Sequence, residues 1–263
     1  MQDIDAQLRS IADQVALVLE PGHDQGELQA DILKRSDHAT ALLVRVGDHR
    51  GFLKLFADTD AAKAAFGREK QALDLLHGTH VPRLLLVGDA ARAVLTVFIE
   101  GRPLGDLLTA SNLMQRAEQI GQLFGTLASR APAQAETADW AAYLGRYETG
   151  LSNRLLAQQR PVLEQNKIKR LHLAQNDAAL ANFIQGKDKR LYLVDFENAR
   201  MKPEGWDLAM AARALFGRFP DQLNVISNSL LRGYRLAAKD CELADNFDQV
   251  INVLVVAMIA SEG

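Results

Sequence analysis

The apolar residues of this chain change their spacing near residue 100. Before that point, apolar runs at 30–46, 51–56 and 93–99 are separated by polar turns, which is typical of β-strands. Beyond it, apolar residues recur every three or four positions, as over 113–127, which is typical of helices. The segment Glu100-Gly101-Arg102-Pro103 interrupts the apolar pattern between the two regions. We therefore expect a domain boundary there.

Three helices and one strand are predicted within these two regions. Apolar positions at steps of three and four predict a helix over 4–18, ended by Pro21-Gly22, and a second over 61–77, ended by Gly78. In the later half, a short strand is expected at 191–196 and a last helix at about 248–260.

Composition and charge exclude several classes of protein. Of the 263 residues 48% are apolar, which favours a folded globular chain, and the net charge of −3 provides no field that would collect nucleic acid or anionic lipid. Asp3, Asp5 and Asp13 interrupt any targeting signal, and no apolar run approaches the roughly 20 residues that cross a bilayer. We expect a cytoplasmic protein that neither binds nucleic acid nor inserts into a membrane.

Two charged residues stand where the apolar pattern predicts hydrophobic ones. Lys54 interrupts the strand at 51–56, and Glu69 lies on the apolar stripe of its helix. A buried charge needs a partner, so we expect these two side chains to form an ion pair. The alternatives are a Lys54 that extends from the strand end to solvent, and an exposed Glu69 paired with Arg68 or Lys70.

A second group of polar residues surrounds the strand at 191–196. Asp195 follows an apolar run, with a turn or a helix N-cap as its alternative role, and Asp177 and Asn182 precede the strand five residues apart. Phosphoryl transfer needs a carboxylate that orients the attacking hydroxyl and oxygen ligands for magnesium. Asp177 fits the first role, and Asn182 with Asp195 fits the second. The spacing of 177 and 182 alone is a weak signal, and the ordered set is more specific.

In this order the residues resemble the aminoglycoside phosphotransferase and choline kinase family, over about residues 28–238. Asp177 and Asn182 align with the catalytic Asp and metal-binding Asn of the motif His-Gly-Asp-x4-Asn. Asp195-Phe196-Glu197 is similar to the family's metal motif, and Trp206-Asp207-Leu208-Ala209 is similar to its Tyr-Asp-Leu-Ala segment.

The resemblance implies an α+β, two-lobed protein-kinase-like fold with the active site between the lobes. A small N-lobe with an antiparallel sheet and a helix would cover residues 1–100, and a larger, mostly helical C-lobe would cover 101–263. The implied activity is transfer of the ATP γ-phosphoryl group, with Mg²⁺, to a hydroxyl of an amino-alcohol, sugar or aminoglycoside-like acceptor.

The same resemblance implies roles for individual residues. Lys54 would contact the α- and β-phosphates, held by Glu69, while Asp177 would be the catalytic base. Asn182 and Asp195 would hold the metal. The adenine would bind backbone groups of the hinge formed by Val97, Phe98 and Ile99, and the phosphates a turn with Ser36 and Thr40. Secondary roles fall to Gln175, Glu197 and Asp207, the last also interpreted as the N-cap of the helix that follows.

Two departures from the family pattern keep a second function open. Gln175 replaces the motif's His, and Asn176 stands in place of its Gly as in the choline-kinase form. No glycine occurs between Glu27 and Val46, so the turn at 35–40 is either the phosphate loop or an ordinary polar hairpin. The alternative function is a degenerate kinase-fold protein that binds nucleotide or a partner without turnover. A protein kinase is less favoured, because Asp207 comes only twelve residues after Asp195.

The acceptor and the oligomeric state stay open at this point. Acidic residues within 239–263 offer a wall for a cationic acceptor, with a solvated acidic surface as the alternative. Trp140, Tyr143 and Tyr147 share a helix face and would line an acceptor pocket or belong to a core.

Overall fold

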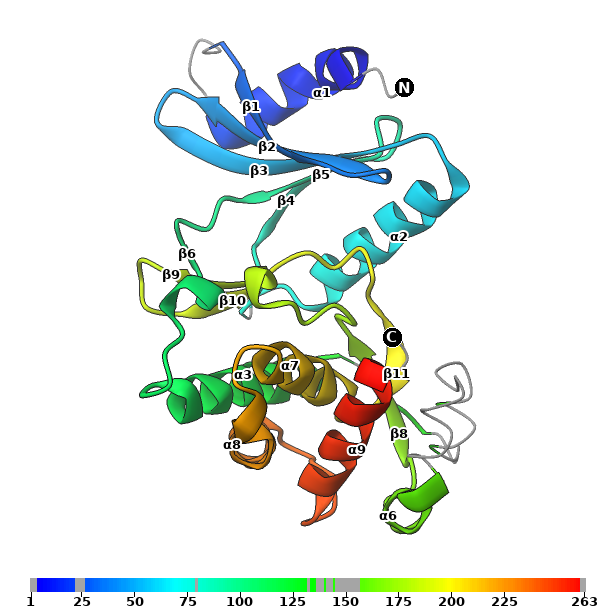
Figure 1. Cartoon of the computed structure of the whole chain (residues 1–263). Helices are drawn as coiled ribbons and strands as arrows, with labels where there is room; N and C mark the ends of the chain where they lie inside the picture. Colours follow the sequence, from blue (N-terminus) through cyan, green and yellow to red (C-terminus); the bar gives the residue numbers. More distant parts are fainter. Residues whose placement is uncertain are drawn as a thin grey trace. The chain divides into compact units, whose positions relative to one another are not determined.

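The computed structural model of the chain describes residues 4–21, 27–78, 80–131, 133–135, 140, 144 and 157–260 (Figure 1). Contacts divide the chain into two compact units. Unit 1 is Met1–Glu100 together with Val194–Asn198, and unit 2 is Gly101–Leu193 together with Ala199–Gly263. Within the described ranges no helix is long and apolar enough to cross a membrane.

Unit 1 is built on a five-stranded antiparallel sheet with strand order β1-β2-β3-β5-β4. Its elements confirm the strands and helices expected before residue 100. They are α1 (Ile4–Leu19), β1 (Gln29–Arg35), β2 (Ala39–Val46), β3 (His49–Phe56), α2 (Asp60–Leu75), β4 (Leu84–Gly88) and β5 (Ala93–Val97).

The two helices of unit 1 pack on opposite faces of this sheet. Leu53 and Leu55 of β3 belong to the core that α1 covers. Side chains alternate along a strand, so Lys54 and Phe56 point to the other face, where the Phe56 ring lies 5.7 Å from that of Phe66 on α2. The alternation of β3 therefore directs the Lys54 side chain toward α2.

Helix α2 starts at a side-chain cap and turns one acidic residue inward. The Thr59 hydroxyl accepts a hydrogen bond from the Ala62 amide at 3.2 Å, which satisfies one free N–H of the first turn. Glu69 is buried along with the apolar stripe of the helix. The prediction that Glu69 points into the fold is confirmed.

Unit 2 contains most of the helices and two three-stranded sheets, with strand orders β10-β9-β6 and β11-β8-β7. The helices among its described residues are η1 (Leu104–Leu107), α3 (Leu113–Ala128), α6 (Arg160–Gln165), η3 (Leu180–Asn182), α7 (Trp206–Phe216), η4 (Pro220–Gln222), α8 (Leu223–Ala237) and α9 (Phe247–Ala260). Its strands are β6 (Gly101–Pro103), β7 (Gln134–Ala135), β8 (Arg170–Ala174), β9 (Phe183–Gly186), β10 (Leu191–Leu193) and β11 (Arg200–Pro203).

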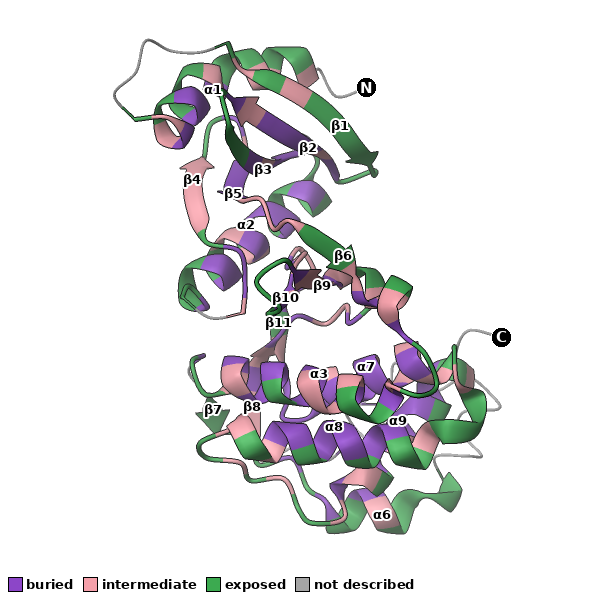
Figure 2. Cartoon of the chain, turned by 90° about the vertical axis from the view of Figure 1, so that its left-hand side faces the viewer, coloured by how far each residue is buried: buried purple, intermediate pink, exposed green. Residues whose placement is uncertain are grey.

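Helices α3 and α8 of unit 2 approach each other closely at glycines. A Cβ atom at Gly121 would lie 2.1 Å from the Leu230 carbonyl oxygen, and one at Gly233 would lie 2.0 Å from that of Glu118. Only a residue without a side chain fits such an approach. Figure 2 shows buried positions along both helices, which form the centre of the unit 2 core.

Two boundaries differ from the sequence expectation. The strand expected over 191–196 ends at Leu193, because Asp195 adopts a left-handed backbone with φ of 67° that cannot continue a strand. The segment expected only as an interruption at residue 100 forms β6, which pairs with β9. Pro103 is tolerated there because β6 is an edge strand and a missing N–H breaks no central ladder.

The structure describes parts of both regions that we considered for an acceptor site. Trp140 is 1% exposed and its ring lies 6.2 Å from that of Phe247, which places it in the core of unit 2. Tyr143 and Tyr147 lie outside the described residues. In the acidic segment, Asp245 is exposed and lies 3.7 Å from Arg235, so it belongs to a solvated surface.

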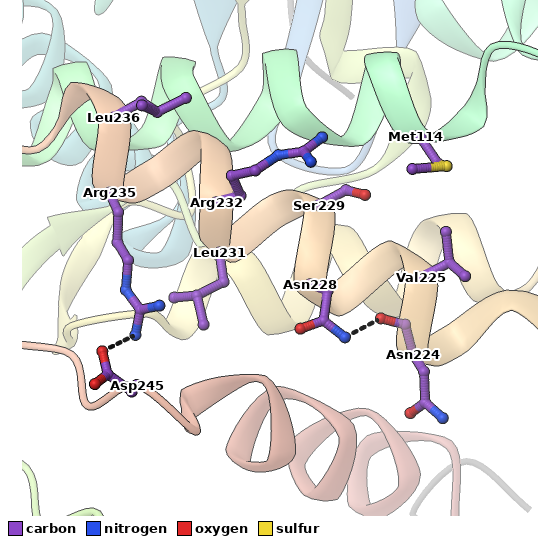
Figure 3. Close-up of a pocket in the computed structure, with 10 residues that line it drawn as sticks. All are labelled: Met114, Asn224, Val225, Asn228, Ser229, Leu231, Arg232, Arg235, Leu236 and Asp245. Carbon is purple, nitrogen blue, oxygen red and sulfur yellow. Dashed lines mark hydrogen bonds and ion pairs between the residues drawn. The ribbon is translucent and has the colours of Figure 1, made fainter.

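A surface groove of about 640 Å³ follows α8 in unit 2 (Figure 3). Exposed apolar side chains of Met114, Val225 and Leu236 line it, and Arg235 forms an ion pair with Asp245 at one end. The residues that line this groove are distinct from the predicted site residues.

Candidate active site

Unit 1 gathers the carboxyls of three predicted site residues around the ammonium of a fourth, Lys54. Lys54 Nζ lies 3.2 Å from Glu69 Oε2, 2.7 Å from Asp195 Oδ1 and 2.9 Å from Glu197 Oε2. The side chains of Lys54 and Glu69 are only 8% and 7% exposed. We call these four residues the lysine cluster. The predicted Lys54–Glu69 ion pair is confirmed, and an exposed Glu69 paired with Arg68 or Lys70 is excluded.

The lysine cluster holds its cation firmly. Burial alone lowers the pKa of the Lys54 ammonium, but the charges of Glu69, Asp195 and Glu197 outweigh it and raise that pKa above its ordinary value. Burial also raises the pKa of the Glu69 carboxyl, and the Lys54 charge opposes this shift. Lys54 is therefore a fixed positive charge within a group that carries three carboxyls. Such a group has carboxylate oxygens to offer to a further cation.

Arg68 fixes the segment that carries two of these carboxyls, a role that the sequence analysis missed. Its Nε donates to the Glu197 carbonyl oxygen at 2.6 Å, which ties Val194–Asn198 to α2. Lys70, two residues further along α2, bonds to Asp89 at 2.8 Å. A backbone carbonyl as partner leaves no trace in a sequence pattern, so no signal in the chain pointed to Arg68.

The proposed nucleotide-contacting residues lie at the ends of strands in unit 1. Val97 ends β5 and donates its amide to the Arg83 carbonyl at 2.9 Å, and the half-buried Phe98 and Ile99 follow it. Ser36 closes the β1–β2 turn, where its hydroxyl accepts from the Ala39 amide at 3.1 Å. Thr40 lies buried in β2. Phosphate-loop and polar-hairpin interpretations both fit this turn.

Residues 175–182 of unit 2 connect β8 to β9, and we call them the catalytic loop after the family motif that they resemble. Gln175 is 2% exposed and its Oε1 accepts a hydrogen bond from the Asp177 amide at 2.9 Å. Asn182 Nδ2 donates to the Asp177 carbonyl oxygen at 2.9 Å. The backbone of Asp177 is thus held from both sides. Gln175 supplies the acceptor at the position where the family motif has His.

Two residues at the start of α7 hold the same loop. Asp207 accepts from the amides of Gln175 at 2.8 Å and Asn176 at 3.0 Å, and burial raises its pKa to about 6. Its interpretation as a helix N-cap is wrong, because Gly205, with φ of 87°, occupies the cap and Asp207 lies one residue inside the helix. Trp206 Nε1 donates to Asn176 Oδ1 at 2.9 Å, a contact that the sequence analysis also missed.

The donor chemistry of these residues fits magnesium. Among the described residues, no three His, Cys, Asp or Glu side chains form a ready-made metal site. Magnesium, however, is usually held by one or two carboxylates together with substrate phosphates and water. Asp195 and Glu197 offer carboxylate oxygens, and Asn182 uses its amide nitrogen for the Asp177 carbonyl, which leaves its carbonyl oxygen for a metal.

The fold is that of the two-lobed kinase-like phosphotransferases, with a small antiparallel sheet domain and a helical domain. The model of the phosphotransferase enzyme family, APH, matches residues 32–238. The chain therefore belongs to this family, and the predicted family and enzyme class are confirmed. In sequence, no curated protein matches the chain.

Solved structures show the same fold at low sequence identity. Macrolide 2'-phosphotransferase type I is 16% identical with a TM-score of 0.63, over 98% of this chain and 89% of that one. Choline kinase LicA from Streptococcus pneumoniae, also solved with AMP, is 15% identical with a TM-score of 0.57, over 98% and 99%. Aminoglycoside phosphotransferase APH(3'')-Id from Streptomyces rimosus is 19% identical with a TM-score of 0.52, over 98% and 99%.

Proposed function

We propose that this chain transfers the γ-phosphoryl group of ATP to a hydroxyl of a small molecule, namely an amino-alcohol, a sugar or an aminoglycoside-like compound. The observation that carries the proposal is the lysine cluster, in which a buried ammonium is held among three carboxyls. A cation held this way costs desolvation energy that a purely structural core avoids by using apolar residues. We infer that the Lys54 ammonium is kept in spite of this cost because it binds phosphate.

In this proposal unit 1 binds the nucleotide. The Lys54 ammonium binds oxygens of the α- and β-phosphates, and Glu69 keeps it oriented through the 3.2 Å contact. Backbone groups of Val97, Phe98 and Ile99 receive the adenine, and the turn at Ser36 and Thr40 lies against the phosphates. Asp195 and Asn182 would hold magnesium, with Glu197 in support, and the ion would supply charge that neutralises the phosphates.

The catalytic loop of unit 2 supplies the base. The Asp177 carboxylate orients the acceptor hydroxyl and takes up its proton. The hydroxyl oxygen forms a bond to the γ-phosphorus, the bond from that phosphorus to the β,γ-bridging oxygen breaks, and ADP leaves. Gln175 and Asn182 support this role, since each bonds to the backbone of Asp177. Catalysis then depends mainly on positioning and on fixed charges.

A panel assay tests the proposal against a chain that binds without turnover. Purified protein is mixed with ATP and Mg²⁺ and offered amino-alcohols, sugars and aminoglycosides, while ADP release and the thermal shift are recorded. We expect ADP release with at least one acceptor class, and none above background from Asp177→Asn. Asp188→Asn, an exposed turn carboxylate of the same unit, is the matched control and should keep full activity. A thermal shift without ADP release would support the non-catalytic alternative.

A further inference from the structure

The residue before the proposed base has an unusual backbone conformation. Asn176 has φ of 61°, in the left-handed region that residues with a side chain rarely adopt. Asn tolerates this region better than most residues, and glycine adopts it freely. Because Asn176 directly precedes Asp177, its backbone angles set the direction in which the Asp177 side chain leaves the loop. Something must keep Asn176 in this conformation.

The side chain of Asn176 is anchored by a buried indole. Trp206 is fully buried, and its Nε1 donates to Asn176 Oδ1 at 2.9 Å. A buried indole N–H without an acceptor is costly, so opening the bond between Trp206 and Asn176 costs free energy. The Lys202 ammonium lies 4.5 Å from the centre of the Trp206 ring, and Lys202 itself is buried, which adds a cation–π contact that fixes the ring.

We propose that Trp206 is a positioning residue, whose indole N–H holds Asn176 in its left-handed conformation and thereby aims Asp177. The catalytic part of this inference rests on the proposed function. Asp207 holds the amides of Gln175 and Asn176, so its bonds act on backbone nitrogens, whereas Trp206 bonds to the Asn176 side chain. A hydrogen bond to a side chain at this residue has a clear use, since it opposes return to the right-handed region.

The inference predicts that the need for Trp206 depends on the residue at 176. With Asn176 present, Trp206→Phe keeps a ring but removes the N–H donor, and Asn176 Oδ1 loses the hydrogen bond from the indole. With glycine at 176 the left-handed backbone needs no anchor. The loss of the indole N–H should then have no further effect on the loop. The cavity left by the smaller ring is the same in both backgrounds and cancels in the comparison.

The experiment is a double-mutant cycle of wild type, Trp206→Phe, Asn176→Gly and the double variant. Hydrogen exchange of the catalytic-loop amides is measured by mass spectrometry, together with kcat and KM for ATP in the panel assay. For Trp206→Phe we expect faster loop exchange and a roughly fivefold to tenfold lower kcat with KM for ATP within about twofold. The double variant should match Asn176→Gly in both measurements. Trp140→Phe, at the other described buried tryptophan of unit 2, should leave loop exchange unchanged.

Each outcome decides the inference. If Trp206→Phe changes exchange and kcat equally in the wild-type background and in the Asn176→Gly background, Trp206 only fills space and the inference is wrong. If loop exchange is restored in the double variant while the wild type transfers no phosphate to any acceptor, the anchoring role stands and the proposed function fails. If exchange is unaffected by Trp206→Phe, the anchoring role fails whatever the activity.

Discussion

The lysine cluster of unit 1 and the catalytic loop of unit 2 are built by different means. In the cluster, formal charges face each other: one ammonium lies within 3.2 Å of three carboxyls. In the loop, backbone amides and carbonyls are held by neutral side chains and by one carboxylate, that of Asp207. In the proposed function, the cluster fixes a charge for binding phosphate, whereas the loop fixes the direction of one side chain.

Because of this difference, changes in the lysine cluster and changes in the loop should affect the stability of the fold differently. Removing one member of a buried ion pair leaves an uncompensated charge, so changes in the lysine cluster should destabilise the fold. In the loop, a change of the terminal group of a side chain should leave the fold intact when other residues hold the backbone at that position. Asp177 is such a residue, because its bonds to Gln175 and Asn182 run through its amide and carbonyl. The predictions below test this separation.

The largest effect is expected on activity from Asp177→Asn. The amide cannot accept the proton of the acceptor hydroxyl, so we expect kcat to fall by about 10²- to 10⁴-fold, the usual share of a general base. The free energy of unfolding should stay within about 0.5 kcal/mol of the wild type, since the backbone bonds remain. Steady-state kinetics and chemical denaturation check both values. A large loss of stability would show that the Asp177 carboxylate also supports the fold.

Lys54→Met, unlike Asp177→Asn, should cause a large loss of stability. The three carboxyls lose their cation, and we expect unfolding to become easier by about 3 kcal/mol at pH 7. Asp195 and Glu197 side chains are 26% and 18% exposed, so water relieves part of the repulsion and keeps the loss near the low end. Chemical denaturation measures the change. Part of the stability should return when Glu69→Leu is added, because a buried carboxyl is then removed.

A matched control distinguishes the buried cation from any surface lysine of the same unit. Lys63 pairs with Asp58 at 2.9 Å, but their side chains are largely exposed. Exposed ion pairs contribute little, so Lys63→Met should change the unfolding free energy by less than about 1 kcal/mol. Equal losses from Lys54→Met and Lys63→Met would contradict the account of the lysine cluster.

The same difference explains which parts of the site the sequence predicts. Lys54 and Glu69 were predicted to pair because each charge interrupts an apolar pattern, and a charge inside an apolar pattern needs a partner. The helices and strands of unit 1 were predicted because their apolar periods differ. Both signals are local in the sequence, and both are consequences of burial.

The contacts of the catalytic loop and of Arg68 left no such signal. Trp206 fits an apolar core, so its hydrogen bond to Asn176 does not disturb any pattern. Arg68 bonds to a backbone carbonyl 129 residues away, which any residue type at 197 would provide. Asp207 was placed at a helix cap because Asp is common there, but the positive φ at the cap is better served by Gly205. These contacts depend on tertiary proximity alone.

Asp207 provides a pH-dependent test of the loop. Its pKa is about 6 in the folded chain, against an ordinary value of 3.8, because burial disfavours the carboxylate. The folded state therefore gains a proton that the unfolded chain lacks, so the stabilisation is complete below about 3.8 and is lost as the pH rises through 6. Relative to Asp207→Asn, the free energy of unfolding of the wild type should rise by about 2 to 3 kcal/mol when the pH is lowered from 7 to 4. A difference that is flat over this range, measured by denaturation, would exclude a raised pKa.

The smallest effect is expected at Arg68, a charged residue beside the lysine cluster that bonds to a backbone carbonyl. This arginine lies next to Glu69 on α2, and its Nε donates to the backbone carbonyl of Glu197. Arg68→Met removes one charged hydrogen bond, which is worth about 1.5 kcal/mol, and loosens the segment that carries Asp195. We expect the Mg²⁺ concentration for half-maximal activity to rise about threefold to tenfold, with kcat at saturating Mg²⁺ nearly unchanged. Lys70→Met, two positions further along α2 and bonded only at the surface to Asp89, should leave the Mg²⁺ requirement unchanged. If both variants shift it equally, the cause is the loss of a positive charge from α2 and not the anchoring of Glu197.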